Sequence, residues 1–295
     1  MLTFVSFFIN INFMREIDFI AMPDDDGKRI RTFLKSHGFS STLITRLKHT
    51  ENGITKNGVF ARTIDTLQAG DVITVHIQSR GHMPAPLKAD VEVCYEDEDV
   101  LVLNKPPHMP VHESHSHIGD TLSNFVAYHL QGDDNAFRAV YRLDRDTSGL
   151  VVVAKHELAA AKLAGCVAKH YDAIVSGIMQ PFGTVDLPIA RFGDSIIERC
   201  VDPNGERSVT HFETLRQYDG YAIIRCVLET GRTHQIRVHM AHIGHPLLGD
   251  SLYGGDCSRI SRQALHCTDV TFEHPVTGET VHLECPYPDD MQRLL

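Results

Sequence analysis

The sequence of 295 residues predicts an α+β protein built from two units. Beyond residue 90, strand-like segments outnumber helical patterns, which predicts a mixed or antiparallel sheet. Residues 15–80 combine two short helical patterns with short strands, which predicts a small α/β unit. Between them, residues 81–90 contain two prolines and a glycine without periodicity. We therefore expect an N-terminal domain over 15–80, a linker over 81–90 and a second domain over 91–295.

The N-terminal unit is expected to fold as a strand, two helices and a series of short strands. Residues 15–22 alternate in polarity as a strand does, and the polar turn 24–27 is placed to cap a helix over 28–38. A second short helix, opened by serine, is expected over 41–50. The segment 53–77 then places an Asn-Gly tight turn and a Gly-Asp pair between strand-like runs, which is typical of hairpins.

The second unit is expected to consist mainly of strands. The strand-like segments are residues 91–95, 100–105, 150–155, 171–177, 209–217, 221–230, 270–274 and 280–285. The helical patterns are fewer and lie at about 120–130, 157–169 and 234–243. The acidic run at 95–100 reads as a turn between the first two strands. This proportion of elements indicates a mixed or antiparallel sheet with a few covering helices.

The net charge of −10 conceals a basic segment. From Lys28 to Arg62 there are eight lysines and arginines and a single acid, Glu51, so that 8 − 1 leaves this segment at +7. Such a face suits a polyanion through its local potential. A solvated charged face without any partner is the alternative that composition alone leaves open.

Cysteine usage and the N-terminus bear on location. The seven cysteines are scattered without a CxxC pair, which indicates reduced thiols and a cytoplasmic protein. Residues 1–14 are apolar, but they lack a basic start and a cleavage site and are too short to span a bilayer. They form either an additional strand or a stretch ahead of an internal start at Met14. No membrane association is expected.

Three segments form a recognisable series of motifs. They are VYRLDRDTSGLVVVAK at 140–155, KHYDAIVSG at 169–177 and ETGRTHQIRVHMAHIGHPLLGDSLYG at 229–254. Together they resemble the RluA-type pseudouridine synthases, whose hallmark is an Arg-Leu-Asp-x-x-Thr-Ser-Gly run. The resemblance covers about residues 90–290. Residues 15–80 are similar to the ribosomal-protein S-four-like RNA-binding domain that often precedes this catalytic domain.

The resemblance implies an isomerase that converts uridine in RNA into pseudouridine by detaching the base, turning it and rejoining it through carbon five. Nothing is oxidised or reduced, so no cofactor is expected. It implies Asp144 as the nucleophile and Arg237 as the cation that keeps this carboxylate ionised. Tyr171 is implied to pack on the base and is a candidate for the proton transfer. Arg142 is implied to fill the gap that the flipped uridine leaves.

The implied partner is RNA, either ribosomal or transfer RNA, with no obligate protein partner. Besides Arg142, the residues expected to contact RNA are basic residues of the N-terminal unit, namely Lys28, Arg29, Arg31, Arg46 and Lys48. Two departures from the family pattern bear on specificity. Tyr141 stands where histidine is frequent, and Pro107-His108 stand where a small residue and a glycine are usual.

Other polar residues near the motifs are expected to be structural. Arg145 and Asp146 should pair locally, and residues 147–149 should shape a turn. Two groups of histidines, at 112–117 and 234–245, are of a type that can bind metal. The first reads as a mobile polar loop, and the second lies in a motif that the family uses without metal. No functional metal is therefore expected.

Two other functions are kept as alternatives. A non-catalytic RNA- or ribosome-binding protein is one, but such a protein does not need the set Asp144, Tyr171 and Arg237. A hydrolase that cleaves a glycosidic bond with Asp144 is the other. Glycosidases generally use two carboxylates, and the nearby Asp146 is not placed by any motif. The detection of pseudouridine or of free uracil after incubation with RNA separates the three functions.

Overall fold

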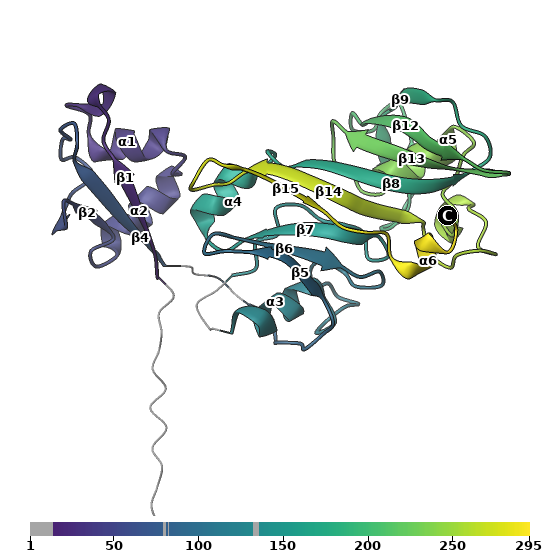
Figure 1. Ribbon diagram of the computed structural model, residues 1–295, viewed down its shortest axis with the longest axis horizontal. Coiled ribbons are helices and arrows are strands. Elements are labelled where there is room, and N and C mark those ends of the chain that lie inside the picture. Colours follow the sequence, from purple (N-terminus) through teal and green to yellow (C-terminus); the bar gives the residue numbers. More distant parts are fainter. Residues whose placement is uncertain (1–13, 79–80, 82, 132–135) are drawn as a thin grey trace, which may run out of the picture.

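The computed structural model describes residues 14–78, 81, 83–131 and 136–295. The expected extension over 1–14 lies outside the described residues except for Met14. Figure 1 shows a small N-terminal unit beside a larger unit organised around one long sheet. The described residues of the expected linker, 81–90, form neither helix nor strand. Within the described ranges, no helix has the length and apolar character needed to cross a membrane, and all seven cysteines are free.

The N-terminal unit is a four-stranded antiparallel sheet with two helices. In spatial order its strands are β1 (Met14–Ile20), β4 (Val72–Gln78), β2 (Ile54–Lys56) and β3 (Val59–Phe60). The helices α1 (Ile30–Ser36) and α2 (Ser41–His49) bury their apolar residues in one cluster with the sheet. The expected strand, pair of helices and hairpin are therefore confirmed.

The turns of this unit follow the sequence in two of three cases. Ser40 caps α2, since its Oγ accepts a hydrogen bond from the backbone N–H of Leu43 at 3.1 Å. Asn57-Gly58 joins β2 to β3 with φ values of 52° and 78°, as a tight hairpin turn requires. The predicted cap at 24–27 is wrong. Pro23–Asp25 form a short 3-10 helix, η1, in which the Asp25 carboxylate accepts from the Met22 N–H instead of from α1.

The larger unit is built on a nine-stranded mixed sheet. Its strands, in spatial order, are β5 (Glu92–Glu96), β6 (Val100–Lys105), β7 (Ser148–Ala154), β14 (Leu265–Glu273), β8 (Ala168–Ser176), β13 (Tyr221–Leu228), β12 (Val209–Gln217) and β9 (Phe182–Asp186), with β15 (Thr280–Glu284) paired to β14. The pair β7–β14 is parallel, and the other neighbours are antiparallel. The predicted α+β class with a mixed sheet is confirmed.

The remaining elements lie around this sheet. They are the helices α3 (Leu122–Leu130), α4 (Glu157–Leu163), α5 (Gln235–His242) and α6 (Asp289–Gln292), the 3-10 turn η2 (Ser251–Tyr253), and a separate pair β10 (Ile189–Arg191) and β11 (Arg199–Val201). The helix expected over 157–169 ends at Leu163, because β8 begins at Ala168. The short strands β9, β10 and β11 were not expected from the pattern.

The two units are in direct contact, and Figure 1 shows the N-terminal unit beside α4. Arg15 of β1 donates to both carboxylate oxygens of Asp99, at 2.7 and 3.1 Å. Arg46 of α2 lies 3.1 Å from Glu157 at the start of α4. Leu158 of α4 is fully buried within the apolar cluster of the N-terminal unit. The smaller unit is therefore seated on the larger one through both charge and apolar packing.

Candidate active site

The loop that carries Asp144 runs directly into β7, in which all seven residues are buried. Within the loop, the N–H of Thr147 donates to the Asp144 carbonyl at 3.1 Å and closes the turn. Gly149 has a φ of 114°, and a Cβ at this position would lie 2.3 Å from the carbonyl oxygen of Cys267 in β14. The glycine of the motif is therefore required for β7 to lie against β14, and this pairing fixes the end of the Asp144 loop.

Lys105, at the end of β6, ties that strand to the same loop. The side chain is fully buried, and its Nζ donates to the carbonyls of Pro106 and Met109 at 2.8 Å each and of Arg145 at 3.0 Å. Burial lowers the pKa of Lys105 to about 7. The three carbonyls match the three donors of the ammonium group and so favour its charged form. The sequence showed only a lysine at a strand end, and its burial was missed.

A buried serine–histidine pair supports the loop from β14. Ser148, the first residue of β7, has its Oγ 2.9 Å from Nδ1 of His266, and both side chains are almost completely buried. Burial, together with the nearby Arg262, lowers the pKa of His266 to about 4. The imidazole is consequently neutral at physiological pH, so it acts as a fixed hydrogen-bonding partner of the loop.

Arg237 of α5 joins Asp144 to a second carboxylate that sequence reasoning missed. Its Nε and Nη2 donate to Asp250 at 2.7 and 2.8 Å, whereas its Nη1 reaches Asp144 Oδ2 at 3.3 Å. The Asp250 side chain is 1% exposed and that of Asp144 is 26% exposed. Burial opposes the charge of Arg237, but the hydrogen bonds to Asp250 and the field of Asp144 raise its pKa above the usual value. Asp250 follows a glycine in the segment HPLLGDSLYG, and nothing in that segment indicates that Asp250 will pair with an arginine.

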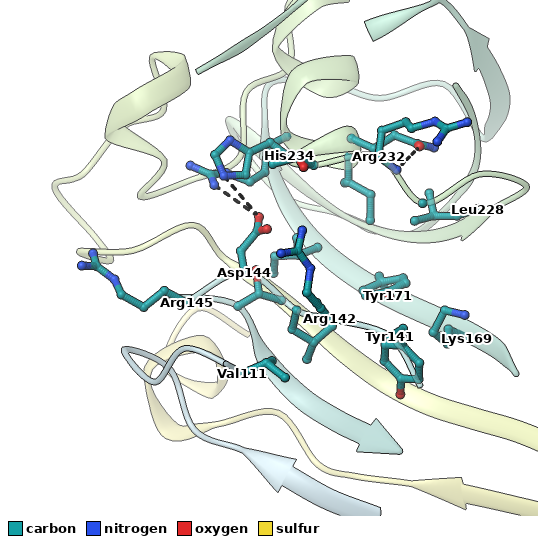
Figure 2. Close-up of a pocket in the computed structure, with 18 of the residues that line it drawn as sticks. Val111, Tyr141, Arg142, Asp144, Arg145, Lys169, Tyr171, Leu228, Arg232 and His234 are labelled. Atoms are coloured by element: carbon teal, nitrogen blue, oxygen red, sulfur yellow. Dashed lines mark hydrogen bonds and ion pairs between the residues drawn. The ribbon is translucent and has the colours of Figure 1, made fainter. Parts of the chain in front are cut away.

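His234 is the second site residue whose position beside Asp144 was not predicted, since the sequence placed it only in a histidine group of a metal-binding type. It precedes α5 in a left-handed backbone conformation, with φ 58°, which is uncommon for a residue other than glycine. Its Nδ1 lies 2.8 Å from the Tyr253 hydroxyl, and its Nε2 lies 3.9 Å from Asp144 Oδ2. Figure 2 shows His234 facing the Asp144 carboxylate. A strained backbone therefore directs the imidazole toward the candidate nucleophile.

A cavity of about 760 Å³ opens beside Asp144. Its walls include Arg142, Tyr171 and Arg237 as well as Asp144, so the three candidate catalytic residues and Arg142 line one cavity. Tyr171 of β8 is 6% exposed. Burial, the neighbouring Cys267 thiol and the charge of Asp144 raise the pKa of the Tyr171 phenol well above its usual value. Figure 2 shows Arg142 between Asp144 and Tyr171.

The basic residues of the N-terminal unit do not line this cavity. Those expected to bind RNA are Lys28, Arg29, Arg31, Arg46 and Lys48. Arg29, Arg31 and Lys48 are exposed, so their contact with RNA stays a prediction. Lys28 lies 2.9 Å from Asp25, and Arg46 faces Glu157 of the larger unit. The position of Arg46 therefore indicates a contact between the units.

The expected local pair is confirmed, and the two departures from the family pattern have structural partners. Arg145 donates to both oxygens of Asp146, at 3.0 and 2.9 Å. His108, which belongs to one of the two departures from the family pattern, lies 2.9 Å from the Asp146 carboxylate. Tyr141 donates its hydroxyl hydrogen to the Leu150 carbonyl at 2.9 Å. Both departures therefore contact the segment that carries Asp144.

A group of side chains with the composition of a metal site lies elsewhere. Among the described residues, Asp97, Asp99 and His274 bring ligand atoms within 4.8 Å of one another, and neither histidine group from the sequence does so. Asp99 is already bound to Arg15 and to His156. Protein groups thus already bind one of the three candidate ligands, and the absence of a functional metal stays a prediction.

The comparison with known proteins places these motifs in a family. A family model described as RNA pseudouridylate synthase matches residues 99–242 and so includes Asp144, Tyr171 and Arg237. The chain is 41% identical over 276 residues to the uncharacterized RNA pseudouridine synthase YjbO of Bacillus subtilis, covering 90% of this chain and 98% of that protein. It is 42% identical over 226 residues, 70% of either chain, to the ribosomal large subunit pseudouridine synthase D of Haemophilus influenzae.

A solved structure agrees with these relatives. The human RNA pseudouridylate synthase domain containing 1 superposes with a TM-score of 0.56 at 28% identity, over 67% of this chain and 83% of that one. The fold, the motif residues and the full-length relatives lead to one conclusion: the chain belongs to the RNA pseudouridine synthase family and is an isomerase that acts on RNA.

Proposed function

We propose that this pseudouridine synthase modifies uridines of large-subunit ribosomal RNA and uses Asp144 as its nucleophile. The assignment of these residues rests on one observation: Asp144, Tyr171 and Arg237 line the same cavity, although Asp144 and Arg237 are far apart in sequence. The ribosomal target is supported by relatives named ribosomal large subunit pseudouridine synthase D, at 36–42% identity. Such a substrate also fits a cytoplasmic protein with free cysteines.

The reaction needs a carboxylate that is ionised and free to approach the ribose. The bond from ribose C1′ to N1 of uracil breaks, a bond from C1′ to C5 forms, the C5 proton is lost and N1 gains a proton, so nothing is consumed. Arg237 supports the charge of Asp144 from 3.3 Å, while its closer contacts go to Asp250. This geometry supplies a favourable field without a tight ion pair that would hold the nucleophile back.

Tyr171 and Arg142 are assigned to the base. The ring of Tyr171 provides an apolar wall on which uracil can pack. Because the raised pKa keeps its phenol protonated, the free enzyme favours the packing role over that of a base for the C5 proton. Arg142 is exposed and lines the cavity, as a side chain that replaces a flipped nucleotide must.

The N-terminal unit, residues 15–80, is proposed as an RNA-binding domain. Its exposed cations, Arg29, Arg31 and Lys48, would contact phosphates rather than bases, since they offer charge without a groove that reads sequence. No obligate protein partner is proposed.

Incubation of the purified protein with separate ribosomal and transfer RNA, followed by mass spectrometry of the nucleosides, tests this function. We expect pseudouridine in ribosomal RNA without free uracil. Free uracil would indicate the hydrolase, modification confined to transfer RNA would reject the target, and RNA binding without either product would indicate a binding protein.

A further inference from the structure

Most of the charged side chains that line the cavity form ion pairs with side chains of opposite charge. Two of its acids are paired, since Asp144 contacts Arg237 and Glu229 contacts Arg207 and His211. The third acid, Glu113, accepts hydrogen bonds from the Asn124 amide and the Gly119 N–H. The cations Arg145, Arg232 and Arg237 pair with Asp146, Glu206 and Asp250 respectively. In the part of the chain that the structure describes, Arg142 and Lys169 line the cavity without a carboxylate within 4.0 Å.

Lys169 is held in the cavity wall by uncharged groups. Its Nζ donates to the Val167 carbonyl at 2.7 Å and lies 4.7 Å from the centre of the Tyr141 ring. The side chain is half-buried, and burial lowers the pKa of Lys169. A partly buried cation without an acid is costly unless an anion completes its environment. A carbonyl and an aromatic face therefore position this ammonium group without neutralising it.

The position of Lys169 relies on Tyr141, one of the two departures noted in the sequence. The Tyr141 hydroxyl is bound to the Leu150 carbonyl of β7, so its ring is fixed at both ends. Figure 2 shows this ring beside Lys169, with Tyr171 on the strand that also carries the lysine. Tyr141 thus acts as a platform that holds the lysine at the cavity wall.

We propose that Lys169 binds a phosphodiester group of the RNA strand next to the flipped-out uridine, a role that rests on the proposed function. Lys169 and Tyr171 are two residues apart on β8, so their side chains share one face about 7 Å apart. A base packed on Tyr171 therefore brings its own backbone within reach of the lysine. One of the three ammonium donors is used by Val167, and two stay available for phosphate oxygens.

The salt dependence of RNA binding tests this site. A short stem-loop RNA containing the target uridine is titrated by fluorescence anisotropy with wild type, Lys169→Met and Lys169→Arg. Loss of one phosphate contact should make the log–log slope of affinity against salt shallower by about 0.7 in Lys169→Met. Lys169→Arg keeps the charge and should keep the slope. Lys169→Met should have the same kcat as wild type, because saturating RNA compensates for weaker binding. Its KM for RNA should rise.

A second measurement uses the wild-type protein and so does not depend on the folding of a variant. The same RNA is made with an uncharged methylphosphonate linkage on the 5′ or on the 3′ side of the uridine. One of the two linkages should weaken wild-type binding as much as Lys169→Met does, and the variant should be insensitive to that linkage.

An unchanged slope in a folded Lys169→Met protein, or equal sensitivity of wild type and variant to both linkages, would overturn the phosphate site. A fall in kcat without a change in slope would also overturn it, because the lysine would then act on the chemistry. Binding is measured apart from turnover. A wild-type protein that makes no pseudouridine would thus reject the proposed function, whereas the binding measurements would still decide whether Lys169 contacts a phosphate.

Discussion

Arg237 and Asp250 form a two-pronged ion pair in the interior, with nitrogen–oxygen distances of 2.7 and 2.8 Å. The same guanidinium reaches Asp144 only at 3.3 Å. The arginine is therefore positioned by Asp250, and Asp144 receives its field. This arrangement explains how a carboxylate can be kept near a cation and still be available to react.

Removal of the arginine should unfold the protein more easily, mainly because of Asp250. Arg237→Ala would leave a carboxylate with 1% exposure unpaired, which typically costs about 3–5 kcal/mol. Arg237→Lys should recover only part of this, because lysine lacks the planar fork that binds both oxygens. Urea unfolding with parallel turnover assays measures both effects. An alanine variant with wild-type stability and activity would show that the ion pair has no role.

Stability should decline in mild acid because His266 is buried in its neutral form. The pKa of His266 is lowered to about 4, whereas an unfolded histidine titrates near 6.5. Above pH 6.5 both states are neutral, and below it the unfolded state gains a proton first, so stability falls between about pH 6.5 and 4. The loss approaches roughly 3 kcal/mol. His266→Asn keeps a polar partner for Ser148 and should flatten this decline, and equal declines in both proteins would contradict the assignment.

Two arginines of the N-terminal unit should behave differently toward RNA. Arg31 is exposed, so Arg31→Gln should make the salt dependence of RNA binding shallower by about 0.7–0.9 if it contacts one phosphate. Arg46 faces Glu157, so Arg46→Gln should leave the slope unchanged and lower stability by less than about 1 kcal/mol. The reverse pattern, with Arg46 controlling the slope, would show that RNA draws α2 away from α4.

Chelation should have no effect. Asp99, one of the three candidate ligands, already binds Arg15 and His156, so we expect no metal to be held at this group. Dialysis against a chelator should leave both the melting temperature and turnover unchanged. Activity that disappears on dialysis and returns with zinc would establish a metal dependence that the sequence and the contacts do not suggest.

The sequence predicted those elements that have a long regular hydrophobic pattern or lie within a long motif. β7 reads as a continuous apolar run because both of its faces are buried, and the hallmark around Asp144 identifies the loop before it. The residues that the motifs assign to catalysis, Asp144, Tyr171 and Arg237, line one cavity. Their chemical roles stay proposals.

The rest depends on tertiary contacts that leave no local signal. Nothing around Asp250 indicates that Arg237 will lie against it, and the backbone strain at His234 appears only once α5 is placed. Leu158 looks like an ordinary helix residue, yet it completes the apolar cluster of the N-terminal unit. A deletion of residues 1–80 would therefore expose an apolar surface on α4, which the reading of 81–90 as a simple linker did not anticipate.

Above all, we propose that Asp144 is the nucleophile at the cavity beside Arg237 and Tyr171. Substitution Asp144→Asn keeps the size of the side chain and removes its charge, while most RNA affinity should come from phosphate contacts. The decisive measurement is pseudouridine formed in ribosomal RNA by the purified variant, together with its RNA affinity. We expect no pseudouridine and an RNA affinity within a few-fold of wild type, whereas turnover by the variant would show that Asp144 is not the nucleophile.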